Sequence, residues 1–146
     1  MNFVDREKQI EKFWDDNHIF EKSMEEREGC PDYIFYDGPP TANGKPHIGH
    51  VLTRVIKDMI PRYRTMKGSM VPRKAGWDTH GLPVELEVEK LLGLDGKDQI
   101  EEYGLEPFID KCKESVWKYK GMWEDFSGTV GFWADMENPY VTYDNN

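Results

Sequence analysis

Apolar residues recur at intervals of three or four in three stretches of the chain, residues 3–20, 51–66 and 107–126. This spacing places the apolar side chains on one face of an α-helix, so we predict a helix in each stretch. The first helix should pack outside a sheet, and the third should turn its aromatic stripe toward the core. Gly68 supplies a stop for the second helix.

Short runs rich in aromatic and β-branched residues indicate strands. Residues 33–36 form one such run, and we predict a second strand at residues 70–72. A strand, a helix and a second strand make a β-α-β unit, whose strands run parallel and whose crossover is right-handed. The predicted fold class is therefore α/β, with parallel strands and flanking helices.

Residues 84–89 alternate apolar and acidic side chains, and this periodicity alone predicts a strand. We predict a helix instead, because Glu and Leu are good helix formers, Pro83 suits a first helical turn and Gly93 supplies a stop. Residues 93–104 are interpreted as an acidic connection with at most one short helix. After residue 128 we predict a loop with a short extended piece at residues 140–143.

The segment between the first strand and the second helix has the composition of a rigid phosphate-binding corner. Gly38 and Gly44 permit close approach of a ligand to the backbone, while prolines at positions 39, 40 and 46 stiffen the loop. The helix N-terminus that follows offers unpaired N–H groups and the positive end of the macrodipole. His47 and His50 are three residues apart, which puts both imidazoles on one helix face. In an arbitrary chain, such a pair is more often a pair of surface residues than of catalysts.

Asp78 follows the predicted second strand. Ligands of parallel α/β sheets bind outside the carboxyl ends of the strands, where the loop before His47 should also emerge. On the residues alone, Asp78 is either a turn or cap aspartate or a ligand-binding carboxylate.

Composition bounds the class of protein. The chain has 146 residues, 38% hydrophobic and 13% aromatic, which suits one globular domain. No apolar run approaches the length of a membrane span and the N-terminus has no signal-peptide layout, so we expect a cytoplasmic protein with no membrane partner. Cys30 and Cys112 lack metal-ligand spacing and are expected to be free thiols, with Cys112 in the core.

The formal net charge of −9 argues against this chain holding RNA by itself, and we expect no DNA partner. The charge is uneven, because residues 54–74 contain seven basic residues and one acid. A solvated helix face is the simpler interpretation of this basic stretch. The functional interpretation is attraction of a phosphate-bearing ligand.

Three adjoining segments resemble class I aminoacyl-tRNA synthetases. The tetrapeptide His47-Ile48-Gly49-His50 is identical to the family's signature. It is preceded by Asp37-Gly38-Pro39-Pro40-Thr41-Ala42-Asn43-Gly44 and followed by Lys74-Ala75-Gly76-Trp77-Asp78-Thr79-His80-Gly81-Leu82-Pro83-Val84-Glu85. Both flanks are similar to those of the isoleucine-specific members, and the resemblance covers essentially the whole chain.

The resemblance implies the first half of the family's Rossmann-like catalytic domain. A helical extension is expected at residues 1–32 and the β-α-β core with its following helices at residues 33–146, without editing or anticodon-binding domains. The implied activity is ATP-dependent activation of isoleucine to isoleucyl-adenylate and transfer to tRNA(Ile). The implied partners are isoleucine, ATP with Mg²⁺, and tRNA(Ile). The family's second signature, Lys-Met-Ser-Lys-Ser, does not occur here, so we expect this chain alone not to be competent.

The resemblance also implies roles for individual residues. His47 and His50 are expected to be catalytic, stabilising charge at the α-phosphate. ATP is expected to contact Thr41, Asn43, His47, Gly49 and His50, and the amino acid to contact Gly38, Pro39 and Asp78. No residue is expected to ligate a metal ion. Two alternatives stay open, namely a noncatalytic nucleotide-binding or interaction module and a synthetase for valine, leucine or methionine.

Overall fold

A three-stranded parallel sheet lies at the centre of the structure, a computed structural model that describes residues 2–41 and 44–144. The strands follow one another in sequence order, with β1 at Phe35–Tyr36, β2 at Arg73–Trp77 and β3 at Asp135–Val141. Both strand pairs are parallel, so each connection must return to the amino end of the sheet. The predicted α/β fold with parallel strands and flanking helices is confirmed.

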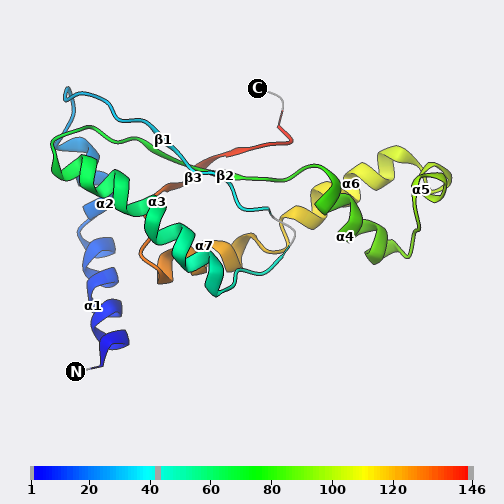
Figure 1. The fold of residues 1–146 in the computed structure, drawn as a ribbon, viewed down its shortest axis with the longest axis horizontal. Coiled ribbons are helices and arrows are strands. Elements are labelled where there is room, and N and C mark those ends of the chain that lie inside the picture. Colours follow the sequence, from blue (N-terminus) through cyan, green and yellow to red (C-terminus); the bar gives the residue numbers. More distant parts are fainter. Residues whose placement is uncertain (1, 42–43, 145–146) are drawn as a thin grey trace.

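Helices make up much of the rest of the described chain (Figure 1). Figure 1 shows an elongated molecule with α1 and α2 toward one end and α4, α5 and α6 at the other, where α6 packs against α4 and α5. α3 connects β1 with β2, and α4 to α7 lie between β2 and β3 in the sequence. The bounds are Phe3–Asp16 for α1, Ile19–Glu25 for α2, Ile48–Met66 for α3, Leu82–Leu92 for α4, Lys97–Tyr103 for α5, Leu105–Val116 for α6 and Lys120–Thr129 for α7.

Two helices predicted as continuous are each broken. The stretch 3–20 divides at His18, whose φ of 50° is left-handed and ends the helical run. The stretch 107–126 divides between α6 and α7, where the Trp117 indole donates to the Tyr143 hydroxyl at 3.1 Å. In both cases the apolar spacing continues across the break, so periodicity alone does not reveal it.

The predicted second strand at residues 70–72 is wrong by several positions. Met70 forms only an isolated bridge with Asp32, and the strand proper begins at Arg73. Pro72 has no N–H to donate, although its carbonyl accepts from Phe35 N at 2.9 Å. The extended piece predicted at residues 140–143 overlaps a longer strand, β3, only at residues 140–141, because β3 begins at Asp135 and ends at Val141, and residues 142–143 form a turn.

The helix prediction for residues 84–89 is confirmed, because α4 spans them, and α5 is the short helix within residues 93–104. α4 buries Val84, which packs with Val116 and the half-buried Cys112. Burial raises the pKa of the Cys112 thiol, and both cysteines are free.

α3 buries one face against the sheet and exposes large apolar side chains on the other. Arg54, Pro61 and Thr65 are its buried residues. The exposed apolar residues are Ile48, Leu52, Val55, Ile56, Met59, Ile60, Tyr63 and Met66.

Candidate active site

The loops that follow β1 and β2 meet beyond the carboxyl ends of these strands. Thr41 and Asp78 form an isolated parallel bridge just past these strand ends, and Asp78 N donates to the Pro40 carbonyl at 3.1 Å. The Thr41 hydroxyl donates to the Asp78 carboxylate at 3.3 Å. The Asp78 side chain is 36% exposed, so its carboxylate keeps access to a ligand.

His47 and His50 cap the N-terminus of α3 in a reciprocal arrangement. Gly49 N donates to His47 Nδ1 at 3.1 Å, and His47 N donates to His50 Nδ1 at 3.0 Å. Two of the otherwise unpaired donors of the helix start are satisfied in this way. The two imidazole rings lie 3.8 Å apart, centroid to centroid, at 33°.

These two hydrogen bonds fix the tautomer of each imidazole. A ring nitrogen that accepts a hydrogen bond carries no proton, so each neutral ring holds its proton on Nε2. The first turn of α3 therefore presents two Nε2–H donors in addition to the helix dipole, an arrangement suited to an anion. Partial burial, helped by His47, Arg54 and Lys57, lowers the pKa of His50, which keeps this ring neutral at pH 7.

Gly49 stands between the two histidines, and a side chain there would require the His47 ring to shift by a few tenths of an ångström. A Cβ at this position would come within 3.0 Å of the His47 ring, closer than ordinary contacts allow. Gly49 itself is exposed, so its backbone is open to a ligand.

A cavity of about 270 Å³ is lined by four of the eight residues expected to contact a ligand, and His47, Gly49 and Asp78 are not among its lining residues. Its lining includes Gly38, Pro39, Thr41 and His50 from the predicted set. Asn43, which was also predicted, lies outside the described residues. The cavity is further lined by Pro40, Thr53, Arg54, Lys57 and Trp123, none of which we predicted as a site residue.

Asp37 pairs with Arg54 and Lys57, two of the residues that line this cavity. Asp37 is 2% exposed. Its carboxylate accepts hydrogen bonds from Arg54 Nη1 at 2.6 Å and from Lys57 Nζ at 2.5 Å. Lys57 Nζ also donates to the Gly38 carbonyl at 2.9 Å, which ties the loop to α3. The spacing of Arg54 and Lys57, three apart on a predicted helix, was the one signal in the sequence for this cluster.

Tyr140 lies on β3, the edge strand opposite β1, and its side chain contacts the same loop. Its hydroxyl donates to the Asp37 carbonyl, and burial, followed by the charges of Asp37 and Asp78, raises the pKa of the phenol. A Cβ at Gly76 would overlap the Tyr140 ring, so Gly76 leaves the room that the ring needs.

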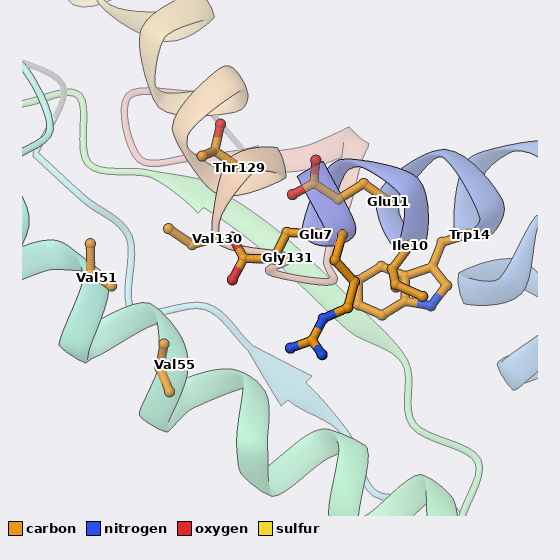
Figure 2. Close-up of a pocket in the computed structure, with 10 residues that line it drawn as sticks. Glu7, Ile10, Glu11, Trp14, Val51, Val55, Thr129, Val130 and Gly131 are labelled. Atoms are coloured by element: carbon orange, nitrogen blue, oxygen red, sulfur yellow. The ribbon is translucent and has the colours of Figure 1, made fainter. Parts of the chain in front are cut away.

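A second cavity, of about 400 Å³, lies elsewhere on the molecule. Figure 2 shows it between α1, α3 and the turn after α7, with Ile10, Trp14, Val51, Val55 and Val130 among its apolar lining. None of the predicted site residues lines it.

Within residues 2–41 and 44–144, no group of three or more His, Cys, Asp or Glu side chains could hold a metal ion. Among the same residues, no helix is both long and apolar enough to cross a membrane.

Comparison with known proteins gives the class to which this site belongs. Residues 9–146 match the family model of tRNA synthetases class I (I, L, M and V). The chain therefore belongs to the class I tRNA synthetases, and the resemblance described from the signature is confirmed.

Relatives within the class are isoleucine–tRNA ligases. That of Clostridium kluyveri is 64% identical over 145 residues, which are 99% of this chain and 14% of the relative. That of Clostridium novyi (strain NT) is 63% identical over 144 residues, again 99% of this chain and 14% of the relative. The chain thus spans about one seventh of the length of these relatives.

A solved structure shares the fold. It is the LeuRS of Agrobacterium radiobacter K84 in a ternary complex with tRNA and LeuAMS, with a TM-score of 0.64 and 20% identity. The match covers 95% of this chain and 16% of that one.

Proposed function

We propose that this chain forms the signature-bearing half of an isoleucine–tRNA ligase active site, acting in the cytoplasm. In this function ATP and isoleucine react to isoleucyl-adenylate and pyrophosphate, and the isoleucyl group then passes to tRNA(Ile). The observation that carries the proposal is the reciprocal cap of His47 and His50, which turns two Nε2–H donors and a helix N-terminus into one anion site.

The proposed chemistry is in-line attack of the isoleucine carboxylate on the α-phosphate of ATP. Charge builds on the equatorial phosphate oxygens, and donors fixed in advance stabilise it without reorganising. We assign this role to the Nε2–H groups of His47 and His50. The lowered pKa of His50 suits it, because a neutral ring keeps Nδ1 as the acceptor that holds the cap.

The other predicted residues form the walls of the proposed site. Asp78 accepts the isoleucine ammonium, supported by the exposure of its carboxylate, which also accepts from the Thr41 hydroxyl and lies 3.9 Å from His80 Nδ1. Gly38 and Pro39 shape the amino-acid side of the cavity, while Thr41, Asn43 and Gly49 contact ATP. Magnesium enters as part of the ATP substrate, bound by its phosphates, and we assign no side chain to it.

A chimera tests this function. Residues 2–146 replace the matched segment of the Clostridium kluyveri relative, because we propose that the present chain alone does not complete the site. Adenylate formation is followed as ATP–pyrophosphate exchange with isoleucine, valine, leucine or methionine. The proposal expects exchange to be fastest with isoleucine. A folded chimera that binds ATP without exchange would support a noncatalytic module instead, and faster exchange with another amino acid would correct the specificity.

A further inference from the structure

Trp123 of α7 touches the signature segment at two points. Its indole Nε1–H donates to the Gly44 carbonyl at 2.9 Å, and its ring lies 4.7 Å from the His50 ring in an edge arrangement at 61°. The side chain is 3% exposed and also lines the cavity of about 270 Å³. A residue far along the chain thus contacts both the loop and the helix start.

The His50 imidazole is held on three sides. Its Nδ1 accepts from His47 N, the His47 ring covers one side at 3.8 Å, and Trp123 closes another. The cap bond alone leaves the ring free to tilt about that bond. A hydrogen-bond donor stabilises developing charge only when its direction is fixed beforehand. The contact with the Trp123 ring therefore helps to fix the direction of the His50 Nε2–H.

We propose that Trp123 is a positioning residue, which fixes the His50 imidazole through its ring and the ATP loop through its bond to Gly44. The importance of this role for catalysis rests on the proposed function. The contacts of Trp123 with His50 and Gly44 do not depend on that function. Trp123 itself is assigned no contact with ATP or isoleucine.

The contact also sets the electrostatic surroundings of His50. The charged or titratable groups that face it are His47 and, on α3, Arg54 and Lys57, both of which pair with Asp37. From α7 the contacting side chain is the uncharged Trp123. Removing the indole should therefore change the burial of His50 without removing a charge, and burial is the largest cause of its lowered pKa.

Three variants of this chain separate the contributions. Trp123→Leu removes the ring and the donor, Trp123→Phe keeps an aromatic ring without the donor, and Trp117→Leu is the matched control. Trp117 is also a hydrogen-bonded indole, but its partner is Tyr143, away from the signature. The pKa of His50 is measured by NMR titration, and ATP affinity by calorimetry.

In Trp123→Leu we expect the pKa of His50 to rise toward the unperturbed value of about 6.5. Trp123→Phe should retain most of the lowering, and Trp117→Leu all of it. ATP affinity should fall by about fivefold or more in Trp123→Leu, because the loop and the imidazole are no longer preorganised. An unchanged His50 titration in a folded Trp123→Leu chain overturns the inference, as does an equal shift in Trp117→Leu.

The unsubstituted chain supplies a measurement that does not depend on a variant folding. Cross-relaxation between the Trp123 and His50 ring protons and slow exchange of the Trp123 indole N–H are both expected, and the lack of either overturns the inference. The His50 titration needs no ATP. Failure of the unsubstituted chain to bind ATP would therefore count against the proposed function, while the titration still decides the role of Trp123.

Discussion

Replacing Asp37 with Asn should cost this chain a large part of its stability. Arg54 and Asp37 are both nearly inaccessible, with side chains 4% and 1% exposed, and their atoms lie 2.6 Å apart. Asn keeps the size of the side chain but removes its charge, which leaves the Arg54 guanidinium buried without a counter-ion. Breaking one partner of a buried ion pair costs about 3–5 kcal/mol.

Two features reduce this loss. Lys57 is 24% exposed, so its ammonium can reach water when Asp37 is neutral. The Arg54 guanidinium also keeps the face of the Phe132 ring, 4.3 Å from its centroid, a contact worth about 0.5–2 kcal/mol that survives the substitution. We therefore expect Asp37→Asn to lower the free energy of unfolding by about 2–4 kcal/mol. This loss is a large share of the 5–15 kcal/mol that is typical of a folded domain.

Urea unfolding followed by circular dichroism measures this loss, provided that the slope with denaturant is unchanged. Asp16→Asn is the matched control, because Asp16 pairs with Lys12 at 2.8 Å on the solvated face of α1 and should lose far less. The double variant Asp37→Asn with Arg54→Met should be more stable than Asp37→Asn alone. A loss below about 1 kcal/mol for Asp37→Asn, the range of exposed pairs in general, would refute the reasoning.

Three further outcomes are expected. Asp78→Ala should weaken isoleucine binding to the chimera by about 1.5–3 kcal/mol, the value of a hydrogen bond to a charged group, and unchanged affinity in calorimetry would make Asp78 a turn residue only. Gly76→Ala should destabilise the chain more than Gly128→Ala in thermal unfolding, because the new methyl meets the Tyr140 ring at the first position and open space at the second. Because the folded pKa of His50 lies below its unfolded value of 6.5, the stability that its neutral ring contributes is complete above about pH 6.5 and is lost as pH falls through the folded pKa. His50→Gln should lack this component of the pH dependence in urea unfolding, and an identical dependence in both proteins would contradict the assignment.

The sequence was sufficient to predict the features that depend on neighbouring residues. Glycines and prolines define the loop before α3. The spacing of His47 and His50 indicates that their rings meet at the helix start, where His47 is the extended N-cap residue and His50 lies in the first turn of α3. The same is true of α4, where Pro83 and Gly93 bound the helix despite the alternating pattern between them.

Features that depend on distant residues were missed. The strand β2 begins with Arg73 and Lys74, which read as surface residues, yet Arg73 is buried beside Asp58 at 3.4 Å and near the Trp133 ring. The acidic residues of β3 and Pro139 obscured this strand in the sequence. Among the described residues β3 pairs only with β2, and such an edge strand tolerates a proline. Trp123 has no local signature, because its hydrogen-bond partner Gly44 lies 79 positions away in the sequence. The Asp37 cluster is marked only by the spacing of Arg54 and Lys57.

The central claim is that the Nε2–H of His50 stabilises the transition state of adenylate formation, and isoleucine-dependent ATP–pyrophosphate exchange by the chimera tests it most directly. His50→Asn keeps a side-chain acceptor near Nδ1 for the cap but has no donor at the Nε2 position, whereas His50→Gln places an amide N–H closer to that position. We expect kcat to fall by about 10²-fold in His50→Asn, the KM for ATP to change by less than about threefold, and His50→Gln to retain more activity. A kcat in folded His50→Asn within about threefold of the unsubstituted chimera would contradict the claim.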